Sequence, residues 1–536
     1  MILGSDSIFH FNRFYDTAQQ LKNFNFQYYI SMYGFHESGR IVNALYGPLF
    51  AYFHGFLVLI SKNWFLYQLL SNFCLYNLAG FSMYTFLLKG GLERKYALSG
   101  AILFLSTYSI QYWAIRQGFT SWGAALLPLA LSILFELNLT QRIPRWKLGI
   151  LTALLVQAHM LSAFVLVLIY FPFFIYFFLK SKNKIVFFRN LMGEVFLFFC
   201  LTLNIWGAYL NILKGNHLIR PIVNHNMSLN TINQNSYYWL LNPVILIFML
   251  VTIYYIFLKK WKQINSIQTK LWFWIMTIFL VLSSSLIPWS YLVKVKNPVA
   301  ELIQFPFRFF VPVSIITIYL FLKLIQNKQI LKNKQREILI FFLVISQLQT
   351  IALNGIVAAS WHSSSNFMPS NYKVKFLSDI ANIKKSFYDV DKGKALNLVV
   401  KGTPDYLPLY GIKNENTNYY DLYLEMIVPQ KKFKKFVRDG KLIIEWTGNA
   451  DSMIEVPIII YQNTVINLNG ERLSHDQISL SSIGIPKINQ ISYKKNQIIL
   501  SYNVSRIEVI LLIGTILTWL TIVVALLKEI LISSRS

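Results

Sequence analysis

Residues 148–180 read LGILTALLVQAHMLSAFVLVLIYFPFFIYFFLK, and Lys180 is the first Lys, Arg, Asp or Glu in the run. An apolar segment of about 20 residues is long enough to cross the hydrocarbon core of a bilayer as a helix. The rest of the chain has the same character, since 55% of its residues are hydrophobic and 14% are charged, against about 25% charged in soluble domains. The sequence therefore predicts an α-helical polytopic membrane protein.

Other apolar segments of similar length follow one another along the chain. They lie at 64–88, 96–115, 120–137, 188–213, 238–259, 271–292, 308–325, 337–357 and 507–528. Five basic loops separate them, at Lys89/Arg94, Arg142/Arg145, Lys180/Lys184, Lys259/Lys260 and Lys328/Lys332. Lys and Arg concentrate in the cytoplasmic loops of membrane proteins. The net charge of +27 is therefore a topology signal, and it does not indicate a nucleic-acid partner.

Placing all five basic loops in the cytoplasm constrains the crossings between them. Residues 148–180 would begin and end inside, so we expect two short crossings that turn near 159–162. Residues 45–62 fit only as an interfacial or re-entrant helix. The N-terminus comes out external, so we expect a first transmembrane helix to be missing upstream of Met1. The expected fold has about 11 transmembrane helices.

Residues 358–506 are predicted to form a mostly-β extracytoplasmic domain. Strand-like runs occur at 396–400, 442–446, 453–461 and 497–502, with Asn-Gly and Asp-Gly pairs between some of them; such pairs are typical of tight turns. The predicted organisation has four parts: an external first loop with interfacial helices (1–63), a transmembrane helical domain (64–357), the β domain (358–506), and a last helix with a short cytoplasmic tail (507–536). The location is the plasma membrane, with several spans.

Acidic residues are scarce outside the β domain, and those predicted to be external are Asp6, Asp16, Glu37 and Glu301. Asp6, His10 and Arg13 have i, i+4, i+7 spacing and would share one helix face. A carboxylate, an imidazole and a guanidinium together at a membrane surface indicate a site, although Asp6 could instead be a helix N-cap. Asp6, His10, Glu37 and Glu301 are the catalytic candidates, and Asp6 is also the candidate metal ligand.

Several arginines are predicted on the same external side, among them Arg13, Arg116 and Arg308. Guanidinium groups bind phosphate oxygens bidentately, and the neighbouring apolar helices could hold a lipid tail. We therefore expect a polyprenyl-phosphate-linked donor. His159, at the turn of the split span, is a further substrate-binding candidate, because ionisable groups at that depth are often functional. The alternatives are packing for His10 and Arg13, an interfacial anchor for Arg308, and a neutral His159 that bonds a free carbonyl.

A set of motifs gives the chain a family resemblance. They are Gly4–His10 with Arg13, Tyr46–Phe50, Gln157–Ser162, Gln304–Arg308, Asp405–Pro408 and Val456–Tyr461. In this order they resemble the bacterial polytopic proteins labelled 6-pyruvoyl-tetrahydropterin synthase-related, which are similar to YfhO-type proteins and to GT-C glycosyltransferases. No His cluster suited to pterin chemistry is present in the sequence.

The GT-C resemblance implies a catalytic acid in the first external loop, where Asp6 lies, and it adds Gln304 to the substrate-binding candidates Arg13, Arg116, His159 and Arg308. The implied function is transfer of a sugar from a polyprenyl-phosphate donor to a cell-wall or lipid glycan acceptor of a Gram-positive-type envelope, with membrane lipids as further partners. Family members carry a Glu shortly after the arginine that matches Arg116, whereas residues 117–122 here contain no acid. Glu37 or Glu301 could substitute in a Mg²⁺ or Mn²⁺ site, the reaction could need no metal, or activity has been lost. The alternative is a non-catalytic membrane protein that translocates a lipid or scaffolds wall-polymer assembly.

Overall fold

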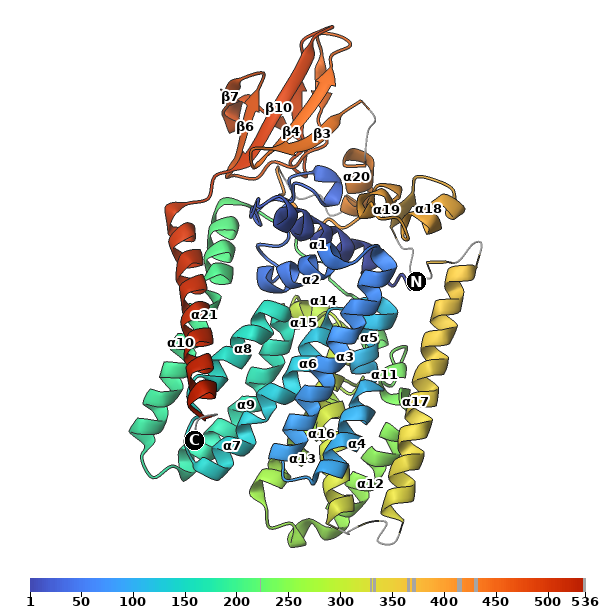
Figure 1. Ribbon diagram of the computed structural model, residues 1–536, viewed down its shortest axis with the longest axis vertical. Coiled ribbons are helices and arrows are strands. Elements are labelled where there is room, and N and C mark those ends of the chain that lie inside the picture. The colour runs from blue at the N-terminus through green and yellow to red at the C-terminus, as the bar shows by residue number, and fades with distance from the viewer. Residues whose placement is uncertain are drawn as a thin grey trace.

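The computed structural model describes residues 1–221, 223–327, 330, 334–363, 367–368, 373–411, 417–428 and 432–533. Lys328 and Lys332 of the last basic loop lie outside these residues. The structure is mostly helical, and a C-terminal β-rich region precedes a final helix, α21 (Arg506–Ser533). The β-rich region lies at one end of the helical bundle, next to the N-terminus, and α21 returns along the bundle (Figure 1).

The bundle is built from apolar helices of unequal length. They are α3 (Trp64–Lys89), α4 (Arg94–Leu105), α5 (Tyr108–Arg116), α6 (Thr120–Leu131), α7 (Ile133–Thr140), α8 (Lys147–Ala158), α9 (Met160–Lys180), α10 (Lys184–Gly215), α11 (Tyr238–Leu241), α12 (Ile245–Lys260), α13 (Ile267–Leu282), α14 (Trp289–Lys294), α15 (Pro298–Ile303), α16 (Phe310–Gln326) and α17 (Gln335–Ala359). Six helical stretches among the described residues are long and apolar enough to cross a membrane: 120–140, 160–180, 184–215, 306–326, 335–362 and 506–529.

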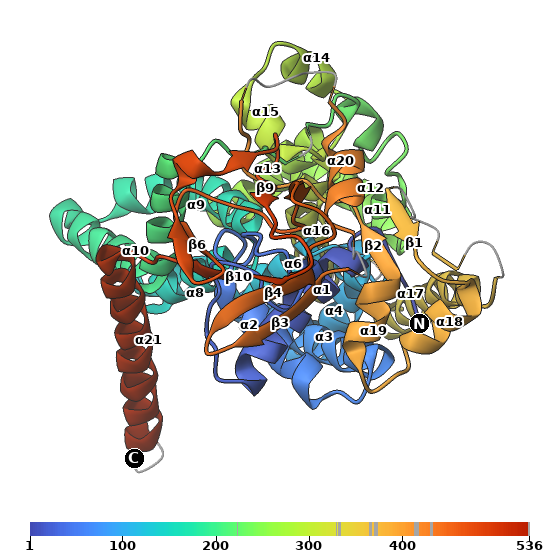
Figure 2. The ribbon, with the colours of Figure 1, turned by 90° about the horizontal axis from the view of Figure 1, so that it is seen from above.

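These long helices differ in what surrounds them. α16 is buried along nearly its whole length and is the centre of the bundle. α17 and α21 expose many large apolar side chains and lie at the periphery, as the view from above shows (Figure 2). Exposed apolar side chains on long helices are what lipid contact requires, so the chain has the character of an integral membrane protein.

The predicted break in 148–180 occurs at His159. α8 ends at Ala158 and α9 begins at Met160, while His159 between them has extended backbone (φ −157°, ψ 101°). The Nδ1 atom of His159 lies 2.9 Å from Ser162 Oγ. The run therefore forms two helices, as the distribution of basic loops predicts.

The first two helices lie across the end of the bundle that faces the β-rich region (Figure 1). They are α1 (Ser7–Lys22) and α2 (Pro48–Ile60), and α2 covers most of the segment predicted to be interfacial. Gly47 precedes α2 with φ +65°, and a Cβ there would lie 2.1 Å from Gln157 O. Only glycine combines this backbone conformation with so close an approach, so Gly47 fixes the start of α2 against the end of α8.

The described residues of the β-rich region form three antiparallel sheets. The largest has the order β3-β4-β10-β6-β7 and consists of β3 (Lys434–Arg438), β4 (Lys441–Thr447), β10 (Lys495–Tyr502), β6 (Thr464–Leu468) and β7 (Glu471–Leu473). Asp439-Gly440 forms the turn of the β3-β4 hairpin, and Asn469-Gly470 forms the turn of the β6-β7 hairpin. All four residues have positive φ, as two-residue hairpin turns require. The smaller sheets are β5 (Met453–Glu455), β9 (Pro486–Asn489) and β8 (Ser479–Leu480), and the pair β1 (Val374–Phe376) and β2 (Val399–Lys401).

The first part of the predicted β domain differs from the expectation, because it is largely helical. It contains α18 (Ile380–Ser386), α19 (Lys392–Leu398) and α20 (Tyr419–Met426). Asp379, Asp391 and Asn418 begin these helices as N-caps whose side chains accept hydrogen bonds from backbone N–H groups. Each helix has seven or eight residues, which is too short for a clear hydrophobic periodicity.

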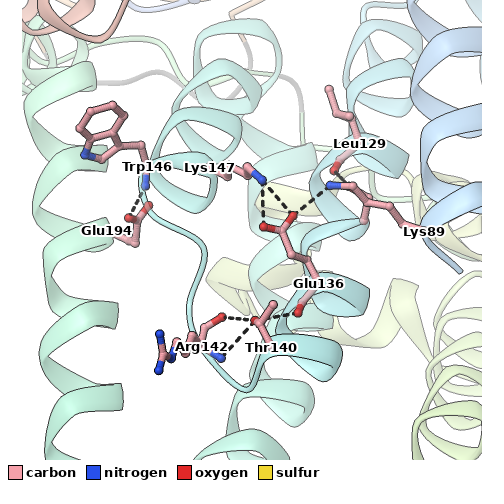
Figure 3. Close-up of polar contacts among 9 residues, drawn as sticks. Lys89, Leu129, Glu136, Thr140, Arg142, Trp146, Lys147 and Glu194 are labelled. Atoms are coloured by element: carbon pink, nitrogen blue, oxygen red, sulfur yellow. Dashed lines mark hydrogen bonds and ion pairs between the residues drawn. The ribbon is translucent and has the colours of Figure 1, made fainter. Parts of the chain in front are cut away.

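Polar contacts tie helices together at the end of the bundle away from the β-rich region (Figure 3). The Glu136 carboxylate receives Lys89 Nζ at 3.1 Å and Lys147 Nζ at 2.8 Å. The Glu194 carboxylate accepts Trp146 N at 2.6 Å and Gly149 N at 2.9 Å, and so satisfies the first N–H groups of α8. These acids have structural partners and lie far along the bundle from Asp6.

Candidate functional site

Asp6 lies at the N-cap position of α1 without capping it. Its side chain makes no hydrogen bond to the helix, and 45% of that side chain is exposed. The Oδ1 atom lies 3.8 Å from Lys401 Nζ, at the end of strand β2. The carboxylate therefore faces the junction between the helical bundle and the β-rich region, with a cation beside it.

The N-terminal segment, residues 1–6, packs on the turn between α5 and α6. Gly4 N donates to Gln117 Oε1 at 2.6 Å, and Asp6 N donates to Arg116 O at 3.3 Å. Gln117 has left-handed backbone (φ 53°), and a Cβ on Gly4 would lie 2.3 Å from Arg116 Cα. The position of Asp6 thus depends on a glycine at position 4.

His10 and Arg13 are buried beneath this surface. Arg13 Nε donates to Asn43 Oδ1 at 3.1 Å, its Nη2 donates to Tyr46 O, and its Nη1 lies 3.3 Å from His10 Nδ1. The guanidinium also stacks over the Tyr46 ring at 4.3 Å. Arg13 therefore holds the loop before α2 against α1, and its bonds are directed to the chain and not to a ligand.

His10 packs between aromatic rings and is neutral. Its ring centroid is 5.0 Å from that of Phe119 and 5.6 Å from that of Phe14. Burial, and then the neighbouring charge of Arg13, hold the pKa of His10 well below its usual value. Lys401 and His159 also lie within electrostatic range of His10. The imidazole is thus beside the site but enclosed by packing.

Arg308 approaches the same place from the start of α16. Its Nη1 donates to Ile303 O at 2.9 Å and to Gln304 Oε1 at 3.3 Å. Its Nε is buried and has no hydrogen-bond acceptor among the described residues. An unpaired buried donor of a guanidinium costs free energy until an anion or a water accepts it. Gln304 positions Arg308, and Asn224 Nδ2 donates to the Gln304 carbonyl at 2.8 Å.

A small cavity of about 10 Å³ lies between α6, α9 and α16, about the space of one water molecule. Thr120, His159, Ser162 and Arg308 supply its polar lining, and the other lining residues are apolar. Asp6 is within electrostatic range of Arg308, Tyr46 and Tyr112. The structure therefore groups Asp6, Arg308 and His159 around one junction.

The other predicted residues divide between this junction and more distant places. Arg116 hydrogen-bonds to the Tyr108 side chain and carries the carbonyl that binds Asp6 N. Glu37 lies in the left-handed turn η1 (Phe35–Glu37), where it interacts with the half-buried Lys435. Glu301 forms an ion pair with Arg220 at 3.8 Å. Among the described contacts, neither Glu37 nor Glu301 is brought to Asp6.

The sequence analysis missed two charged residues of the junction, Lys401 and Asp405. Lys401 Nζ donates to Ser5 O in addition to facing Asp6. Arg40 Nη2 donates to the Asp405 carbonyl at 2.7 Å, and Arg40 Nη1 donates to Thr403 Oγ1 at 3.0 Å. Asp405 belongs to a motif of the family resemblance, but the resemblance implies no role for it. Nothing local in the sequence places it opposite Asp6.

The donor set around Asp6 does not fit a divalent cation. Within the described ranges, no group of three or more His, Cys, Asp or Glu side chains could hold a metal ion. The Lys401 ammonium lies 3.8 Å from Asp6 Oδ1, where its positive charge would repel a divalent cation. We therefore derive no step through a metal.

Comparison of the chain with protein-family models, curated proteins and solved structures finds no match.

Proposed function

We propose that the chain is an integral membrane glycosyltransferase that transfers a sugar from a polyprenyl-phosphate donor to an extracytoplasmic cell-envelope acceptor. The observation that carries the proposal is the Asp6 carboxylate, which is free of its helix cap and lies near Arg308, whose buried Nε has no acceptor among the described residues. An acid next to an unsatisfied phosphate-binding group suits displacement at a sugar carbon bonded to phosphate.

The proposed roles follow from the partners of each residue. Arg308, with Arg116 beside it, stabilises the leaving phosphate. Asp6 orients the acceptor hydroxyl, and Lys401 holds the Asp6 carboxylate in place. His159 and Gln304 position Arg308, while the buried His10 and Arg13 hold α1 and the loop before α2. Apolar side chains of α9 and α16 beside Arg308 provide a path for the lipid of the donor.

Orientation in the membrane is part of the proposal. The basic loops that the structure describes lie at the end of the bundle opposite to the β-rich region (Figure 1), and the positive-inside rule would place that end in the cytoplasm. The site and the β-rich region would then face the outside of a plasma membrane, where wall or lipid glycans are available as acceptors.

The test measures release of polyprenyl phosphate by protein purified in nanodiscs. The donors are polyprenyl-phosphate-linked glucose, mannose and N-acetylglucosamine in turn, with cell-envelope glycan as the acceptor. Asp6→Asn should lower the rate by about 10²–10⁴-fold, whereas Asp476→Asn, at an exposed acid of the β-rich region, should not. Equal rates for Asp6→Asn and the wild type would reject the proposal.

A non-catalytic role in lipid translocation or wall-polymer scaffolding is the second candidate. It is favoured by Gln117, which stands close to where the family carries an acid and whose side chain is used to bind Gly4 N and the carbonyls of Trp113 and Ala114. In this case no polyprenyl phosphate would be released from any donor, and an Asp6→Asn strain would keep its wild-type envelope glycans.

A further inference from the structure

We propose that Asp405, carried by the β-rich region, is the second carboxylate of the site and takes the proton of the acceptor hydroxyl. Asp6, paired with Lys401, then orients that hydroxyl without accepting its proton. The inference rests on the proposed glycosyltransferase function. It assigns the role of proton acceptor to a residue that lies outside the first external loop.

The segment that carries Asp405 is held over the site by its backbone. The Arg40 side chain is fully buried, and its bonds go to the Asp405 carbonyl and to Thr403 Oγ1. Its guanidinium stacks over the rings of Phe35 at 4.7 Å and Tyr423 at 5.2 Å. Arg40 thus anchors the segment through the main chain and leaves the Asp405 carboxylate available.

One oxygen of the Asp405 carboxylate lacks a hydrogen-bond partner among the described residues. Asp405 Oδ1 is buried and has no hydrogen-bond partner among the described residues, while the residue as a whole is only partly buried. A purely structural buried carboxylate is normally hydrogen-bonded. The unpaired oxygen of Asp405, beside the junction, can therefore accept a hydrogen bond from a hydroxyl group of a substrate.

Burial and neighbouring charged groups together set the pKa of Asp405. The charged and titratable groups in electrostatic range are Arg40, Lys401, Asp6, Tyr46 and Tyr406. Burial is the main cause that raises the pKa of Asp405 to about 6; Asp6 adds to the rise, and Arg40 and Lys401 oppose it. A base of this kind is ionised at neutral pH and still basic enough to accept a proton.

The step balances in atoms and charge. The acceptor oxygen forms a bond to the anomeric carbon of the sugar while the bond from that carbon to the phosphate oxygen breaks. The electron pair of the broken bond leaves with the polyprenyl phosphate, which Arg308 stabilises. The hydroxyl proton passes to Asp405 and is later lost to water, which restores the carboxylate.

The experiment compares Asp405→Asn, Asp405→Glu, Asp6→Asn and Asp476→Asn in the polyprenyl-phosphate release assay between pH 4.5 and 8. The wild-type kcat/KM should fall below about pH 6. Asp405→Asn should lose about 10²–10⁴-fold and also lose the acid limb of the profile, and Asp405→Glu should recover part of the rate. Because the Arg40 bond to the main chain persists, Asp405→Asn should unfold within a few degrees of the wild type.

The outcomes separate this inference from the proposed function. If Asp6→Asn is inactive and Asp405→Asn keeps the wild-type rate and acid limb, Asp405 is not the base, although the glycosyltransferase proposal survives. If Asp405→Asn is slower but keeps an unchanged acid limb, its role is structural and the inference is overturned. If Asp6→Asn is as active as the wild type, the proposed function fails, and the inference fails with it. As a second readout, infrared titration should show carboxyl absorbance that titrates near pH 6, to which Asp16 also contributes. Asp405→Asn in an Asp16→Asn background should remove this absorbance, and its persistence there would also overturn the inference.

Discussion

Replacing Gly4 by alanine tests whether the contact with the Arg116–Gln117 turn holds Asp6 in place. The added Cβ would lie 2.3 Å from Arg116 Cα and 2.5 Å from Arg116 O, which are backbone atoms that no rotamer change can move. Such overpacking costs about 1–3 kcal/mol. Separating the two segments also loses the hydrogen bond from Gly4 N to Gln117 Oε1, worth about 1 kcal/mol. We expect a total of about 2–4 kcal/mol against the docked N-terminal segment.

Amide hydrogen exchange, followed by mass spectrometry in nanodiscs, measures this opening directly. Since each 1.4 kcal/mol is a tenfold change, exchange in residues 1–6 should become roughly 30- to 700-fold faster. The matched control is Gly355→Ala in α17, where an added Cβ meets nothing within 4 Å. Wild-type protection of the N-terminal segment in Gly4→Ala would refute the argument that this close approach positions Asp6.

Three further predictions concern groups whose partners the structure defines. Glu194→Ala should lower the free energy of unfolding by about 1–3 kcal/mol, because Trp146 N and Gly149 N lose their acceptor. Thermal unfolding in detergent measures this effect, and an unchanged Tm would contradict the structural role of Glu194. Burial raises the pKa of Asp16 to about 6, above its value of about 4 in the unfolded chain, so folding favours the protonated form. The contribution of Asp16 to the free energy of unfolding is therefore complete below about pH 4 and is lost as the pH rises through 6. Unfolding curves measured at a series of pH values should lack this decline in Asp16→Asn. Lys401→Met should lower polyprenyl-phosphate release by at least tenfold, because Asp6 loses its only ion pair among the described residues. EDTA, in contrast, should change the wild-type rate by less than twofold.

Local pattern and charge were sufficient to predict a mostly helical chain with long apolar helices and a C-terminal β-rich region before a final helix. The split of 148–180 follows from the basic residues at both ends, because two inside ends require an even number of crossings. The hairpins around Gly440 and Gly470 follow from the Asp-Gly and Asn-Gly pairs, which accept positive φ. The hairpin turns are decided by a few neighbouring residues, and the split is decided by the even number of crossings between two cytoplasmic loops. Neither prediction requires knowledge of long-range contacts.

The helical face of Asp6, His10 and Arg13 shows where such reasoning ends. Periodicity places the three residues on neighbouring turns, but it does not say which partners they meet. Arg13 turns out to bind Asn43 and the Tyr46 carbonyl, since burial of a guanidinium demands acceptors wherever the fold supplies them. The phosphate-binding prediction for Arg13 therefore lacks support from the geometry, whereas Arg308 keeps an unpaired donor.

The pairing of Asp6 with Lys401 joins residues about three quarters of the chain apart, so no local pattern could reveal it. The two residues meet because β2 ends beside α1, and α1 contacts both β2 and α19. A site assembled in this way couples the bundle to the β-rich region: the former supplies Asp6 and Arg308, and the latter supplies Lys401 and Asp405. It follows that the β-rich region contributes to the chemistry as well as to acceptor selection. A chain shortened before residue 374 should therefore lose the site even where its transmembrane helices still assemble.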